Sequence, residues 1–235
     1  MIESLANWLG PQEWQAVRLS LRVAFWATLA SLPLGILTGY ALARWRFPGR
    51  GVLNGLVHLP LILPPVVTGY LLLMAFGRRG PVGAFLENSL GIVLAFRWTG
   101  AALAAAVMGF PLMVRAIRLS IEATDPRLEQ AAATLGANRL AVFLTVTLPL
   151  AAPGIIAGAI LAFAKAIGEF GATITFVSNI PGQTQTIPTA IYAFLQTPGG
   201  GEGALRLVIL SVAIAMAALL ASELMARRVA RRLEG

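Results

Sequence analysis

The chain lacks cysteine, and it has a single lysine and a single histidine among its 235 residues. Without cysteine it can form no disulfide, no thiolate metal site and no thiol redox centre. Lys165 lies in LAFAKAIGEF, so the chain has no glycine-rich loop ending in Lys and then Ser or Thr to hold nucleotide phosphates. His58 has no carboxylate or cysteine at ligand spacing, which favours packing or hydrogen bonding over a metal site. We therefore expect the chain to bind neither metal nor nucleotide.

Charged residues are also scarce. They make up 12% of the chain, against 57% apolar residues, whereas soluble domains have about 25% charged residues. This balance indicates a membrane protein. The net charge of +8 does not indicate nucleic-acid binding, because the basic residues flank apolar runs instead of clustering on one soluble face. Residues 1–15 contain no basic residue and so lack the start of a cleavable signal, which leaves insertion to the first apolar run.

Five apolar runs are long enough to predict transmembrane helices, since a helix needs about 20 mostly apolar residues to cross the hydrocarbon layer. The last run is short and reaches the interfaces by drawing in Arg206 and Glu223, whose long side chains can extend to water. We expect an all-α integral membrane protein in which residues 1–235 form a single domain, with spans near 17–43, 52–76, 92–117, 150–172 and 204–226.

The arginines predict the orientation of these spans, because short cytoplasmic loops are enriched in Lys and Arg. Five crossings put the two ends of the chain on opposite sides. With the C-terminus inside, 11 of the 18 basic residues fall on the cytoplasmic side, namely Arg44, Arg46, Arg50, Arg115, Arg118, Arg127, Arg139, Arg227, Arg228, Arg231 and Arg232. Four others, Arg18, Arg22, Arg78 and Arg79, fall outside. We expect an outside N-terminus and a cytoplasmic C-terminus.

The second run is rich in proline. In GLVHLPLILPPVVTGYLLLMAF, Pro60, Pro64 and Pro65 each remove a backbone donor and open the helix ladder. Such a break persists in a membrane only where protein or a water-filled cavity satisfies the freed carbonyls. The break is either a packing kink or a bend around a translocation path.

Residues 170–201 contain no charge but many hydroxyl and amide side chains. So much hydrogen-bonding capacity is unsuited to facing lipid. We expect this stretch at the outer mouth, partly as a re-entrant or amphipathic segment, where a soluble partner docks or an ion enters.

A short amphipathic helix is predicted in the segment PRLEQAAATLGA. Asp125 is a good helix cap, and Pro126 suits the first helical position. Leu128, Ala132 and Leu135 fall on one face. Gly136 should end the helix, and the chain then returns to the membrane through Pro149 and Pro153.

This segment resembles the cytoplasmic EAA loop of type I ABC importer permeases. Ala131, Ala132 and Gly136 fit the Glu-Ala-Ala and Gly positions, and Leu148 and Pro149 fit its distal Leu-Pro. Gln130 takes the place of the motif's glutamate and Glu129 comes one residue early, which leaves open which of the two makes the polar contact. The resemblance implies a coupling loop at about 125–147 that docks in a cleft of an ATP-binding subunit dimer. The alternative is an amphipathic helix lying on lipid.

The resemblance extends over most of the chain. It includes FPGR at 47–50, HLPLILPPVVTGYLLL at 58–73, FPLMVRAIR at 110–118 and GEFGATITFVSNIPGQTQTIPTAIY at 168–192, which are similar to the molybdate branch of these permeases. Sulfate and thiosulfate permeases share GEFGA and the loop, so they remain the alternative within the class. A self-contained channel or secondary transporter is an alternative from another class, but the halves of the chain show no clear repeat.

The resemblance also implies the reaction and the partners. The chain would be a non-catalytic permease of the bacterial cytoplasmic membrane that imports molybdate, with tungstate inseparable from it. ATP and magnesium would be held by the ATP-binding dimer. A second permease subunit, of the same sequence, would complete the path, and an extracytoplasmic binding protein would deliver the oxyanion.

Two groups of residues are candidates for the path. Lys165 and Glu169 are four residues apart on one helix face and can pair, either as a structural ion pair or as part of a gate. A tetrahedral dianion can be held by hydroxyls, amides and helix N-termini, and weak ligation suits a conduit. The candidate ligands are Thr173, Thr175, Ser178 and Asn179.

Overall fold

The computed structural model describes residues 8–234, without the side chains of 222, 223 and 225–234. All its regular elements are helices within this part of the chain. Three helices are long and apolar enough to cross a membrane, and the number rises to five if each of two bent helix pairs is one span. The expected all-α membrane fold is therefore confirmed. The three long candidates are Pro11–Arg44, Trp98–Ala123 and Gly201–Ala221.

The centre of the molecule is a bundle of α2 (Pro11–Arg44), α6 (Trp98–Ala123) and α10 (Ala152–Ile167). Small residues let these helices approach closely, which matters in a membrane because lipid is as apolar as the helix surfaces. A Cβ added at Gly35 of α2 would lie 2.6 Å from the sulfur of Met113 in α6. One added at Gly158 of α10 would lie 2.9 Å from the Met113 carbonyl oxygen. Met113 is fully buried between these helices.

The proline-rich run is not one continuous helix. It forms α3 (Arg50–Ile62) and α4 (Pro65–Phe76), whose axes are bent by 115° at the break. Pro64 and Pro65 mark this break, because neither can donate a backbone hydrogen bond. α4 then packs on α11 (Gly171–Val177), where a Cβ at Gly69 would come within 2.9 Å of the Ala172 Cα.

The structure also differs from the expected third span near 92–117. Residues 81–90 form a separate helix, α5 (Pro81–Leu90), which Gly91 ends in a left-handed conformation with φ +65. α6 begins only at Trp98 and continues to Ala123. As a consequence, Arg118, which follows the expected end of the span, lies within the same helix as Arg115.

The fourth expected span is broken at both of its ends. Arg139–Leu150 forms α8 (Arg139–Val142), the π-helix η1 (Phe143–Thr147) and α9 (Leu148–Leu150), and this segment bends by 68° into α10. At the other end, α10 stops at Ile167, where Gly168 and Glu169 separate it from α11. The expected helix over 150–172 therefore becomes α10, a break and α11.

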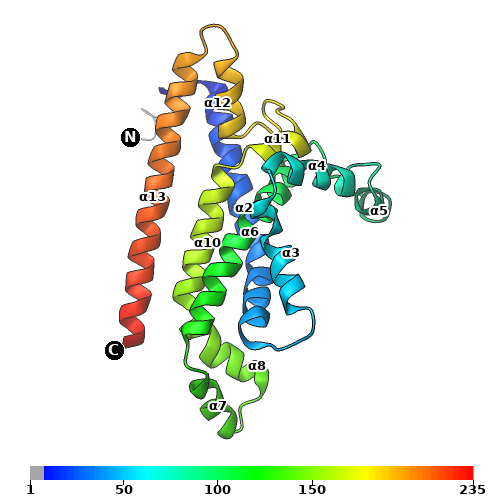
Figure 1. The fold of residues 1–235 in the computed structure, drawn as a ribbon. Coiled ribbons are helices and arrows are strands. Elements are labelled where there is room, and N and C mark those ends of the chain that lie inside the picture. The colour runs from blue at the N-terminus through cyan, green and yellow to red at the C-terminus, as the bar shows by residue number, and fades with distance from the viewer. Residues whose placement is uncertain (1–7, 235) are drawn as a thin grey trace.

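The two ends of the bundle differ in what they contain (Figure 1). α7 (Pro126–Thr134), α8 and the turn between α2 and α3 lie at one end. α12 (Ile187–Leu195) lies at the other end, and α13 (Gly201–Glu234) runs from there along the outside of the bundle towards the α7 end. Only 11% of the apolar window of α13 is buried within the chain. Its arginines Arg227, Arg228, Arg231 and Arg232 have side chains outside the described residues.

Candidate coupling segment and translocation face

The helix α7 has the predicted local structure. The Asp125 carboxylate accepts a hydrogen bond from the Arg127 amide at 2.9 Å, which caps the first turn. Gly136 has φ +90, and the Ala137 amide donates to the Ala132 carbonyl at 3.2 Å across the end of the helix. This is the six-to-one hydrogen bond of a Schellman motif, in which glycine takes the left-handed conformation. The predicted start and stop of this helix are therefore confirmed.

Glu129 connects α7 to the membrane-spanning bundle. Its Oε1 accepts hydrogen bonds from the Arg44 Nε at 3.1 Å and from the Thr147 hydroxyl at 3.0 Å. The Arg44 guanidinium also donates through Nη2 to the Thr124 carbonyl at 2.9 Å. Both charged side chains are only 16% exposed, and Thr147 is fully buried. Glu129 thus joins α7 to the end of α2 and to the π-helix η1, and Arg44 in turn joins α2 to the end of α6. We call Arg44, Thr124, Glu129 and Thr147 the Glu129 latch.

Gln130 and the two alanines of the motif lie differently. Gln130 and Ala131 are exposed, and Ala132 is half-buried. Among the described residues, the Gln130 side chain has no hydrogen-bond partner within the chain. The polar contact inside this chain is therefore made by Glu129, the residue one place before the motif's glutamate position. Gln130 and Ala131 are left on the outer surface.

The chain returns from α7 to the bundle through an irregular helix. η1 inserts a wider turn at residues 143–147, and the Thr145 hydroxyl donates to the Ala141 carbonyl at 2.6 Å. Such π turns occur mostly as single insertions, often at functional positions. Leu148 and Pro149 follow immediately, just before the 68° bend into α10. This bend makes α7 to α9 an arm at the end of the bundle instead of a straight extension of α10.

Lys165 and Glu169 form the expected pair, although Glu169 lies beyond the end of α10. The Lys165 Nζ is 2.6 Å from Oε2 of Glu169, whose side chain is only 1% exposed. The other oxygen of Glu169 accepts from the Ala172 amide at 3.0 Å. A buried carboxylate with both oxygens bonded avoids much of its desolvation cost. The pair bridges the break between α10 and α11.

The four candidate ligands of residues 170–201 do not present their polar atoms together. Thr173 is only 1% exposed, and the Thr175 hydroxyl donates to the Gly171 carbonyl of its own helix at 2.8 Å. Ser178 is exposed, with a left-handed φ of +64. The buried Asn179 Oδ1 has no hydrogen-bond partner among the described residues. The described conformation therefore has no ready-made oxyanion site at these residues.

Much of the polar capacity of the same stretch satisfies irregular backbone. The Thr184 hydroxyl accepts from the Ile180 amide at 2.9 Å and donates to the Ser178 carbonyl at 3.2 Å. The Ile187 amide donates to the Ser20 hydroxyl of α2 at 2.7 Å. These bonds fix the connection between α11 and α12, which lies at the end of the bundle away from α7 (Figure 1).

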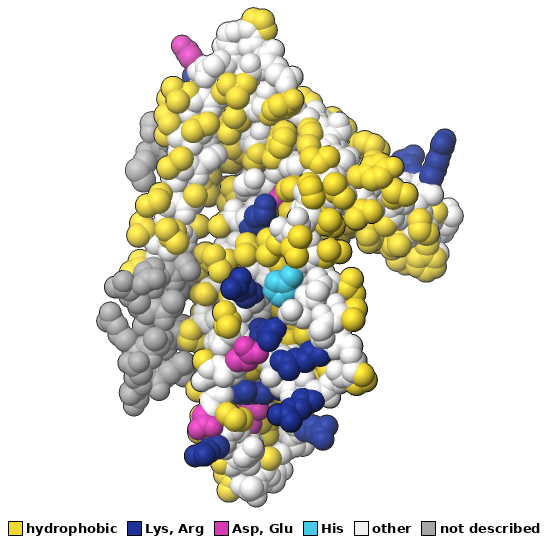
Figure 2. All heavy atoms as spheres, viewed as in Figure 1, with side chains coloured by type: hydrophobic (Ala, Val, Ile, Leu, Met, Phe, Trp, Pro, Cys, Tyr) yellow, Lys and Arg dark blue, Asp and Glu magenta, His cyan; other side chains and the backbone are white. Residues whose placement is uncertain are grey.

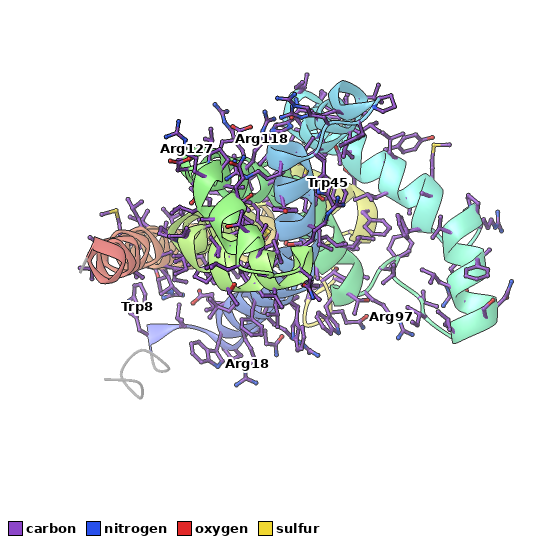
Figure 3. The ribbon with its side chains drawn as sticks, turned by 90° about the horizontal axis from the view of Figure 1, so that it is seen from below. Trp8, Arg18, Trp45, Arg97, Arg118 and Arg127 are labelled. Atoms are coloured by element: carbon purple, nitrogen blue, oxygen red, sulfur yellow. The ribbon has the colours of Figure 1, made fainter. Side chains whose placement is uncertain are left out.

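The sequence alone did not predict a polar hollow of about 320 Å³ that lies between α3 and α6. Its lining comprises Asn54, His58, Arg115, Arg118, Leu119 and Glu122. In Figure 2, dark-blue Lys and Arg side chains lie beside and below the cyan histidine on this face. Figure 3 shows Arg118 on the side of the bundle opposite Arg18 and Arg97. The signal in the sequence was the spacing of the polar residues, which are three or four positions apart on each helix.

Comparison with known proteins identifies close relatives. Residues 31–235 match the family model described as "Binding-protein-dependent transport system inner membrane component". The chain is 62% identical over 215 residues to the molybdenum transport system permease protein ModB of Escherichia coli, covering 92% of this chain and 94% of that protein. It is 39% identical over 186 residues to the sulfate transport system permease protein CysT of Salmonella typhimurium, covering 79% of this chain and 67% of that protein.

Solved structures share the fold at low sequence identity. A bacterial alginate ABC transporter in complex with an alginate-bound periplasmic protein matches with a TM-score of 0.74 and 19% identity, over 94% of this chain and 80% of the matched chain. The inward-facing MetNI methionine ABC transporter matches with a TM-score of 0.68 and 15% identity, over 97% of this chain and 99% of the matched chain. These likenesses support the fold alone.

Proposed function

The chain belongs to the family of binding-protein-dependent transport system inner membrane components, and we propose that it is the permease subunit of an ABC importer for molybdate. The observation that carries the choice of substrate is the 62% identity to a molybdenum permease over 92% of the chain, against 39% to a sulfate permease. Tungstate has the same charge and tetrahedral shape, so we expect it to follow the same path. Sulfate transport is the second candidate, supported by the CysT relative.

The coupling role of α7 is part of this proposal. Gln130 and Ala131 are both exposed. Gln130 is uncharged and Ala131 is small, which suits close approach to a cleft in the ATP-binding subunit. Glu129 has its carboxylate engaged within the chain. In this mechanism, closure of the ATP-binding dimer moves α7. The Glu129 latch passes that movement to α2 and α6, and η1 with Leu148 and Pro149 passes it to α10.

The remaining partners follow from the same proposal. ATP and magnesium are bound by the ATP-binding dimer. A second copy of this chain completes the path, and an extracytoplasmic binding protein delivers the oxyanion at the α12 end. The proposed orientation has the N-terminus outside and the C-terminus in the cytoplasm. It is supported by the arginine count, and dark-blue Lys and Arg side chains gather towards the α7 end of the molecule in Figure 2.

The Lys165–Glu169 pair is proposed as part of the gate. It bridges the break between α10 and α11, and its carboxylate also accepts the Ala172 amide. A change in the angle between these helices would stretch both contacts at once. The pair would therefore break and reform as the bundle opens to one side or the other.

Uptake in living cells tests the substrate. A bacterial strain that lacks its own molybdate permease receives this chain together with its ATP-binding subunit and binding protein. We expect accumulation of radiolabelled molybdate at low external concentration to be restored, and a moderate excess of sulfate to leave it unchanged. Restoration of sulfate uptake without molybdate uptake would replace the proposed substrate by the second candidate.

A further inference from the structure

The hollow between α3 and α6 combines two complementary helix faces. On α6, Arg115, Arg118 and Glu122 are separated by three and four residues, so their side chains share one stripe of the helix. On α3, Asn54 and His58 are four residues apart and face this stripe. The Arg118 Nη1 donates to the Asn54 Oδ1 at 3.0 Å, so the two helices meet through their polar groups.

These groups lie along the bundle, not beyond its end. Arg115 is eight residues before the end of α6, a distance of about 12 Å at about 1.5 Å per residue. Charged side chains near the hydrocarbon layer are costly when they face lipid, and they usually line a bundle interior or a water-filled cavity. A face with two arginines, an amide and an imidazole is therefore suited to an aqueous path.

The hollow has donors prepared for an anion. The Arg118 guanidinium is held by Asn54 and, through Nε, by the Glu122 carboxylate at 2.8 Å. Arg115 is exposed, and among the described residues it has no ion-pair partner. Planar guanidinium groups fit the oxygens of tetrahedral oxyanions through two parallel hydrogen bonds.

We propose that this hollow is an oxyanion site on the cytoplasmic half of the translocation path, in which Arg115 and Arg118 bind the dianion before its release. The inference rests on the proposed function, and it adds the residues that receive the substrate. Glu122 competes with the dianion for Arg118, which keeps binding weak. Weak binding is what a conduit requires, because an ion held tightly would not leave.

The competition gives the proposal two opposite predictions. Arg115→Gln removes one charged donor and keeps a polar side chain, so the affinity for a dianion should fall about tenfold. Glu122→Gln removes the competing carboxylate, so the affinity should rise. A variant that merely disturbs folding would not bind more tightly. Arg46→Gln is the matched control, because Arg46 is exposed in the turn between α2 and α3 and is not part of the hollow.

The experiment measures binding of radiolabelled molybdate by equilibrium dialysis to the purified permease with its ATP-binding subunit, without nucleotide or binding protein. Uptake by the same complexes in proteoliposomes is measured in parallel. Weaker binding by Arg115→Gln and stronger binding by Glu122→Gln, with Arg46→Gln unchanged, is the expected result. Unchanged binding in both hollow variants, in complexes that do take up molybdate, would overturn this site alone. A wild-type complex without molybdate uptake would overturn the proposed function itself.

Discussion

Removing the Glu129 carboxylate should uncouple α7 from the bundle. The carboxylate accepts one hydrogen bond from a guanidinium and one from a buried hydroxyl, and both charged side chains are 16% exposed. Hydrogen bonds to charged groups contribute about 1.5–3 kcal/mol, and partial exposure screens part of this. We expect Glu129→Ala to weaken the latch by about 2 kcal/mol, roughly a thirtyfold change in its equilibrium.

The assay uses the purified complex in proteoliposomes and compares ATP hydrolysis with molybdate uptake. For Glu129→Ala we expect the ATP-binding subunit to stay bound and basal hydrolysis to persist. Stimulation by the loaded binding protein and uptake should both fall, by up to about thirtyfold. Gln130→Ala is the matched control, because Gln130 is exposed and adjacent. It should affect retention of the ATP-binding subunit more than the thermal stability of the permease.

A double-mutant cycle then isolates the contact. Arg44→Gln and Glu129→Gln each remove one charge of the pair, so the double variant should lose much less than the sum of the two single losses. Fully additive losses would show that the two side chains act independently. Wild-type stimulation and uptake in Glu129→Ala, at equal protein level, would refute the latch.

Three further changes test other parts of the account. Gly136→Val should abolish coupling, because a left-handed conformation costs a residue with a side chain about 1–2 kcal/mol, while the protein still inserts. Gly199→Val, at φ +78 in another open turn, is the control. Equal uptake by both variants would contradict the role of α7. Glu13→Gln should lower the melting temperature, because the buried Glu13 carboxylate accepts a hydrogen bond from Arg206 at 2.9 Å. An unchanged melting temperature would show that this pair does not stabilise the packing of α13. Reporter fusions at the two ends of the chain should report opposite sides of the membrane, and two cytoplasmic ends would require a sixth crossing.

The strongest local signals in the sequence predicted the structure well. Asp125, Pro126 and Gly136 predicted the limits of α7 because a capping carboxylate, a proline and a left-handed glycine act on the backbone within a few residues. The apolar runs predicted the membrane class because the length and composition of a run decide whether a helix can cross the hydrocarbon layer.

Features that depend on contacts between distant segments could not be predicted in this way. The bend of 115° between α3 and α4 brings α4 against α11, and no residue near Pro64 indicates that partner. The choice between Glu129 and Gln130 depends on Arg44, which lies 85 positions earlier in the chain. Thr173 and Thr175 were predicted to be ligands, but Thr173 is buried and the Thr175 hydroxyl donates to the Gly171 carbonyl of its own helix.

Transport by purified components is the decisive test of the proposed function. The chain is reconstituted in proteoliposomes with its ATP-binding subunit, and the loaded binding protein is supplied on the side of α12. We predict ATP-dependent accumulation of radiolabelled molybdate, which unlabelled tungstate suppresses and an equal concentration of sulfate does not. Accumulation of sulfate with no accumulation of molybdate, or molybdate movement that needs no ATP, would contradict it.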